Sequence, residues 1–173
     1  MTRRQLVVTQ IVAAVAVSAA IALFVPAMLP APVAEGPAER LALAAPWLVV
    51  MGLPLLVAIG RVGGYRFLSP TAMSGATDPA DAELDFRRRL LANMTEQYLL
   101  AVPAYAALAL LLPADRLQLF AVLAVWYVVA RALFAFGYRR APVLRAFGFA
   151  ATFWTTIGVV AAVLWLAFAG AAA

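Results

Sequence analysis

Five apolar stretches, each close to the length that crosses a lipid bilayer, constrain the fold of this chain more than any other feature. A transmembrane helix needs roughly 20 mainly apolar residues. Of the 173 residues, 66% are apolar and 12% are charged, so little of the chain is left for a soluble domain. Because helices satisfy their own backbone hydrogen bonds in lipid, the sequence predicts an all-α membrane protein. The stretches cover about 6–28, 41–60, 90–112, 117–137 and 146–170.

The distribution of arginine predicts the orientation of these helices. All 13 basic residues are arginine, and loops rich in arginine tend to stay in the cytoplasm. Arg40 and Arg116 fall on one side, and Arg131 falls inside a helix. We therefore expect a protein of the bacterial inner membrane with a cytoplasmic N-terminus and an external C-terminus, and we attribute the net charge of +5 to topology rather than to nucleic-acid binding. The arginines on the cytoplasmic side are Arg3, Arg4, Arg61, Arg66, Arg87, Arg88, Arg89, Arg139, Arg140 and Arg145.

Two interpretations of the first apolar stretch stay open. Arg3 and Arg4 before it, and small residues around Ala34 after it, are also found in cleaved signal peptides. The run is longer than the usual signal core, which favours an uncleaved anchor. We accordingly divide the chain into an N-terminal anchor with an external turn, residues 1–40, and a four-helix membrane domain, residues 41–173.

The residue types that are missing exclude several kinds of chemistry. The chain has no cysteine, histidine or lysine. This excludes disulfides, cysteine nucleophiles and Schiff bases, and we predict no metal site. A reactive group must therefore come from a bound ligand.

Two sequence signals mark helix starts on the predicted cytoplasmic side. Asp78 can cap free backbone N–H groups while Pro79 takes the first helical position, so the third helix is expected to enter the membrane near Leu90. Pro142 opens the last helix in a similar way and puts Arg145 in its first turn. There the helix dipole favours a bound anion. The alternative is an interfacial arginine that only sets the topology.

Several polar side chains are predicted to lie together within the membrane. Arg89, Asn93 and Glu96 share one face of the third helix. A rise of about 1.5 Å per residue sets Glu96 roughly 14 Å along that helix, where an unpaired carboxylate is costly. We predict an ion pair, within one protomer or across a subunit boundary, with Arg131, which lies at a similar depth on the fourth helix and shares a face with Tyr138. The pair alone would only lock two helices together, but the convergence of the other side chains on the same level favours a binding site.

The last apolar stretch carries small residues at three- and four-residue steps, a pattern that permits close helix packing in lipid. We interpret this stripe as structural. Its members are Gly148, Ala151, Thr155, Gly158 and Ala162.

These residues, in this order, resemble the MAPEG family, the membrane-associated proteins of eicosanoid and glutathione metabolism. The resemblance covers about 61–170. It rests on Arg89-x-x-x-Asn93-x-x-Glu96, on Arg131 seven residues before Tyr138, and on the stretch YRRAPVLRAFGF that ends at Phe149.

The resemblance implies a four-helix protomer that forms a homotrimer and binds glutathione between neighbouring subunits at the cytoplasmic side. Carried over by position, Arg145 is the catalytic arginine that activates the thiol. The first helix is additional to the family's four, and Phe134 stands where the leukotriene synthase branch has tyrosine and the prostaglandin synthase branch histidine. The glutathione-binding residues implied are Arg89, Asn93, Glu96, Arg131 and Tyr138.

We therefore expect a glutathione-dependent transferase or peroxidase whose lipophilic substrate enters from the bilayer. Two alternatives belong to other classes: a non-catalytic membrane module with the same fold, and a small transporter or channel subunit. Glutathione binding without turnover would favour the first alternative. A polar path through the bundle would favour the second.

Overall fold

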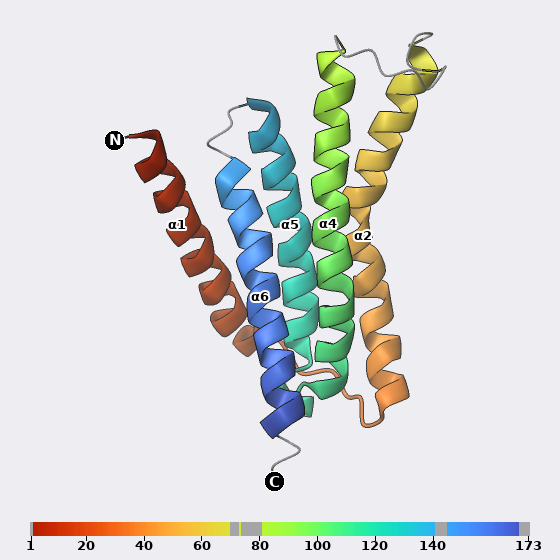
Figure 1. Ribbon diagram of the computed structural model, residues 1–173. Helices are drawn as coiled ribbons and strands as arrows, with labels where there is room; N and C mark the ends of the chain where they lie inside the picture. Colours follow the sequence, from red (N-terminus) through yellow and green to blue (C-terminus); the bar gives the residue numbers. More distant parts are fainter. Residues whose placement is uncertain (1, 70–72, 74–80, 141–144, 170–173) are drawn as a thin grey trace.

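The computed structural model describes residues 2–69, 73, 81–140 and 145–169, and almost all of them are α-helical (Figure 1). No β-strand occurs among these residues, which confirms the predicted all-α class. The elements, in which η marks a short 3-10 helix, are α1 (Arg3–Phe24), η1 (Pro26–Met28), α2 (Pro37–Leu68), α4 (Ala82–Leu111), η2 (Ala114–Arg116), α5 (Gln118–Arg140) and α6 (Arg145–Ala169).

Within the described residues, five helices are long and apolar enough to cross a membrane, one for each predicted stretch. The prediction of an integral, multi-pass membrane protein is therefore confirmed. Two helices reach further than the apolar stretches did, because α2 continues to Leu68 and α4 begins at Ala82. Hydropathy marks only the part of a helix in lipid. Pairs of charges one turn apart, such as Arg87 with Glu83, stabilise the polar part of α4.

The arginines gather at one end of the bundle, as the sequence predicted. At this end lie the start of α1, the end of α2, the start of α4, the end of α5 and the start of α6. The end of α6 lies at the other end (Figure 1). We call it the arginine-rich end. It holds Arg3, Arg4, Arg61, Arg66, Arg87, Arg88, Arg89, Arg139, Arg140 and Arg145.

Four helices form a bundle, and the additional helix α1 packs outside it. Helices α2 and α6 each pack against both α4 and α5, while α1 lies along α6 (Figure 1). The contact of α1 is specific, because Trp126 Nε1 on α5 donates a hydrogen bond of 2.9 Å to Ser18 Oγ. The backbone N–H of Phe147 also donates to Gln10 Oε1 at 3.3 Å. The predicted four-helix bundle with an extra N-terminal helix is thus observed.

Helix α4 is capped at its first described turn. Asp81 Oδ1 accepts hydrogen bonds from the backbone N–H of Leu84 and from the hydroxyl of Tyr65 on α2, both at 2.9 Å. This carboxylate satisfies a free backbone donor and ties α2 to α4 at the arginine-rich end. The cap predicted at Asp78 and the helix opening predicted at Pro142 lie outside the described residues.

Helices α5 and α6 approach each other closely at Gly148. A Cβ atom added there would lie 2.3 Å from the backbone nitrogen of Phe134 and 2.7 Å from the carbonyl oxygen of Ala130. Backbone atoms cannot move aside as a flexible side chain can. At Gly158, in the same small-residue stripe, an added Cβ atom would meet nothing within 4 Å. The stripe therefore supports close packing at Gly148 and leaves open space at Gly158.

We predict that Gly148→Ala destabilises the bundle by about 1–3 kcal/mol or more, because the new methyl group overlaps the backbone of α5. The matched change Gly158→Ala should be neutral or stabilising by up to about 1 kcal/mol, since alanine favours a helix over glycine. Thermal unfolding of both variants in detergent measures the difference. Equal melting temperatures for the two variants would contradict this account of the α5–α6 contact.

Candidate functional site

A groove at the arginine-rich end brings together five of the six predicted site residues. It has a volume of about 420 Å³ and lies between α4 and α6, with α5 behind. We call it the polar groove. Arg131 is the predicted site residue that does not line it. Its lining is Arg89, Ala92, Asn93, Glu96, Phe134, Tyr138, Arg145 and Phe149.

Two exposed arginines stand on opposite sides of the polar groove. Arg89 on α4 forms an ion pair with Asp85 one turn earlier, at 2.7 Å between Nη2 and Oδ2. Both side chains are more than half exposed, so water weakens this pair and leaves the guanidinium able to bind another anion. Arg145 begins the described part of α6, where the helix dipole adds partial positive charge.

Aromatic packing holds Tyr138 and, through it, Arg145. The Tyr138 ring lies 5.4 Å from the rings of both Phe86 and Phe134. The guanidinium carbon of Arg145 lies 4.9 Å from the centre of the Tyr138 ring, within the range of a cation–π contact. The position of Arg145 in the groove is therefore set by α4 and α5 as well as by its own helix.

The ion pair predicted between Glu96 and Arg131 within the chain is wrong. The ion pairs observed among the described residues join Arg87 and Arg139 to Glu83, and Arg89 to Asp85. Three residues beyond Asn93, the Glu96 side chain is turned about 60° around the helix, and it is exposed in the polar groove.

Arg131 is fully buried, with 0% of its surface exposed, and its partners are neutral. Its guanidinium donates hydrogen bonds of 2.7 Å to Asn93 Oδ1, 3.0 Å to Thr152 Oγ1 and 3.2 Å to Met94 Sδ. It also stacks on the Phe134 ring at 4.2 Å. These contacts from three helices supply the stabilisation that we had assigned to Glu96.

Arg131 acts on the polar groove through Asn93. An arginine can only donate hydrogen bonds, so the oxygen of the Asn93 amide must point toward it. The NH₂ group of Asn93 is then left as a donor for the groove. Arg131 is therefore a positioning residue rather than part of the lining. Sequence analysis missed Thr152, whose position one turn after Gly148 is the only signal that it faces α5.

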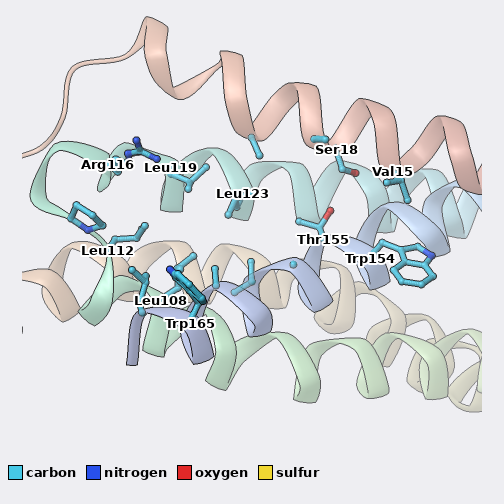
Figure 2. A pocket seen from close by; sticks show the side chains of 17 residues that line it. Val15, Ser18, Leu108, Leu112, Arg116, Leu119, Leu123, Trp154, Thr155 and Trp165 are labelled. Atoms are coloured by element: carbon cyan, nitrogen blue, oxygen red, sulfur yellow. The ribbon is translucent and has the colours of Figure 1, made fainter. Parts of the chain in front are cut away.

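A largely apolar cavity of about 470 Å³ lies toward the other end of the bundle, between α1, α5 and α6 (Figure 2). Arg116 and Leu112 lie at one end of this cavity and Trp154 at the other (Figure 2). It shares no lining residue with the polar groove. We therefore do not assign it to the same site.

Because Arg131 is buried and bonded to neutral groups, we expect the loss of the neutral Asn93 side chain to lower stability more than the loss of the Glu96 charge. Asn93→Ala should lower the stability of the ligand-free protein by about 1.5–3 kcal/mol, because it removes an acceptor from a buried guanidinium. Glu96→Gln, which removes an exposed charge without a partner among the described residues, should change stability by less than about 0.5 kcal/mol. Thermal unfolding in detergent without glutathione compares them. A larger loss for Glu96→Gln would restore the ion pair and refute the observed network.

Comparison with known proteins identifies one family. The profile of the MAPEG family matches residues 41–165, which is more than half of the chain. The match includes the whole lining of the polar groove and excludes α1. No curated protein and no solved structure matches the chain.

Proposed function

Because the chain belongs to the MAPEG family, we propose that it is a glutathione-dependent transferase or peroxidase that acts on lipophilic electrophiles. Family membership supports a glutathione-related function in a membrane. The observation that carries the finer proposal is the convergence of Arg89, Asn93, Glu96, Tyr138 and Arg145 on one groove.

The charges of the polar groove match those of glutathione, which has two carboxylates, one ammonium group and one thiol. Arg89 offers a guanidinium to a carboxylate, since its pair with Asp85 is exposed. Glu96 has no ion pair among the described residues and offers its carboxylate to the ammonium group. The NH₂ group of Asn93 is free to donate a hydrogen bond to a peptide carbonyl of the tripeptide. One carboxylate, the ammonium group and a peptide group of the tripeptide thus each have a complementary side chain in the polar groove.

We assign Arg145 to the thiol. A free thiol has a pKa of about 8.5 and is only a few per cent ionised at neutral pH. A lowering of about two units, from a guanidinium and a helix N-terminus, makes the thiolate predominate. The cation–π contact with Tyr138 holds Arg145 in place for this role.

In the transferase reaction the thiolate attacks an electrophilic carbon, the new C–S bond forms and the leaving group departs with its electron pair. The thiol proton passes to solvent. In the peroxidase reaction a hydroperoxide is reduced to an alcohol and water, while two glutathione molecules are oxidised to the disulfide. Both reactions need only a stabilised thiolate from the protein, which suits a chain without cysteine, histidine and lysine.

The proposed assembly is a homotrimer with glutathione between subunits. The polar groove is lined by three helices of one chain and lies at its surface. Arg89, Glu96 and Arg145 are all exposed in the single chain. A neighbouring subunit over this groove would exclude water and strengthen the contacts to a bound anion.

One observation favours the non-catalytic alternative. Phe134 is 3% exposed and packs under the guanidinium of Arg131. It therefore supplies no hydrogen bond to a ligand, where the synthase branches of the family carry tyrosine or histidine. Retention on glutathione resin without conjugation of a chlorinated nitrobenzene, and without reduction of a lipid hydroperoxide, would support this alternative.

The thiol assignment predicts that Arg145→Ala raises the pKa of bound glutathione by about two units, seen as loss of thiolate ultraviolet absorbance at neutral pH. Arg139→Ala is the matched control, because Arg139 lies at the same end of the bundle and does not line the polar groove. It should keep the absorbance. If the two variants lose it equally, Arg145 is only a topological charge and the proposed mechanism fails.

We further propose that the arginine-rich end faces the cytoplasm. A reporter fused after Ala173 should then be periplasmic, while one inserted near Ser74 should be cytoplasmic. The expected result is alkaline phosphatase activity only in the first fusion. Activity only in the second would invert the protein and place the polar groove outside the cell.

A further inference from the structure

A second groove opens at the arginine-rich end, between α2, α4 and α5. It has a volume of about 520 Å³ and shares no lining residue with the polar groove. We call it the α2–α5 groove. Its described lining contains no aspartate or glutamate and includes four arginines: Arg61, Arg131, Arg139 and Arg140.

The positive charge at the mouth of this groove is poorly compensated. In the described part of the chain, the Arg61 guanidinium has no hydrogen bond or ion pair, and its carbonyl oxygen accepts from Arg87 Nη1 at 2.8 Å. The Arg140 guanidinium has no hydrogen bond or ion pair to the described residues, and it lies 4.8 Å from the centre of the Phe136 ring. The carboxylate nearest to Arg139, that of Glu83, is 3.8 Å away and already pairs with Arg87 at 2.7 Å.

Below the arginines the wall of the groove is apolar. Leu53 and Val57 of α2 are 45% and 59% exposed, and both line the groove. Phe136 of α5 lies opposite and is 55% exposed. From Arg61 to Leu53 this wall extends about 12 Å along α2, at 1.5 Å per residue. The groove thus joins a cationic mouth at the membrane surface to an apolar slot that runs toward the bilayer centre.

We propose that the α2–α5 groove binds an anionic phospholipid of the leaflet at the arginine-rich end. Its phosphate lies between Arg61 and Arg140, and one acyl chain lies against Leu53 and Val57. Guanidinium groups bind phosphate through paired hydrogen bonds, and basic pockets between transmembrane helices recognise anionic headgroups. Arginines that only set the topology need no apolar slot beneath them.

The test uses the full chain in a non-ionic detergent and measures lipid binding by native mass spectrometry. Phosphatidylglycerol is compared with phosphatidylcholine of the same acyl chains and with inorganic phosphate. We expect preference for phosphatidylglycerol, and about 30-fold weaker binding to the double variant Arg61→Gln/Arg140→Gln, because each arginine near an anionic headgroup contributes a several-fold factor. The control Arg3→Gln/Arg4→Gln removes the same charge from α1 at the same end and should change affinity by less than about twofold.

A second variant distinguishes loss of the lipid site from a folding defect. Val57→Trp fills the exposed apolar slot and keeps every arginine, so it should also weaken phosphatidylglycerol binding. Both groove variants should keep the thiolate absorbance of bound glutathione, which separates this site from the polar groove. The proposal would be overturned if the α1 control lost as much phosphatidylglycerol affinity as the groove variants, or if phosphatidylcholine bound equally well. It would also be overturned if inorganic phosphate displaced the lipid equally from wild type and from Val57→Trp.

Discussion

The buried guanidinium of Arg131 is the constraint on which the arginine-rich half of this bundle depends. A charged group without exposed surface is tolerated only when its donors are satisfied, and here the partners come from different helices. Asn93 and Met94 belong to α4, Thr152 to α6 and Phe134 to α5 itself. Sliding any of these helices by one residue would break a bond to the buried charge. Arg131 therefore fixes the register of α4, α5 and α6, and with it the side chains that line the polar groove.

Close packing between α5 and α6 makes this network possible. Gly148 lets the backbone of α6 approach that of α5, and its carbonyl oxygen accepts a hydrogen bond of 3.1 Å from the Thr152 hydroxyl. The same hydroxyl oxygen accepts from Arg131 at 3.0 Å. A bulkier residue at position 148 would move Thr152 away from the guanidinium. The small residue and the buried charge are thus two parts of one arrangement, although the sequence shows them as separate patterns.

Apolar composition and helical periodicity were enough to predict the membrane helices and the residues that share a helix face. They were not enough to predict contacts that depend on how each helix is rotated about its axis. Apolar runs located the five membrane helices, and helical spacing placed Arg89, Asn93 and Glu96 on one groove. The rise per residue also put Glu96 and Arg131 at similar depths, but depth does not say which way a side chain points. The structure turns Glu96 outward and satisfies Arg131 with neutral groups. Thr152 was missed because its role depends on a neighbouring helix whose distance is set by Gly148.

The arginines have more than one role, and the burial of each side chain distinguishes these roles. A topological arginine needs only to stay at the membrane surface, where water satisfies it. Arg131 lies about nine residues, or roughly 14 Å, below Arg140 along α5, so topology cannot explain it. It stands between two grooves, since it holds Asn93 toward the polar groove and itself borders the α2–α5 groove. A ligand in either groove therefore meets a surface whose geometry the same buried charge maintains. This explains why a chain with few charged residues places one of them where an unsatisfied charge is most costly.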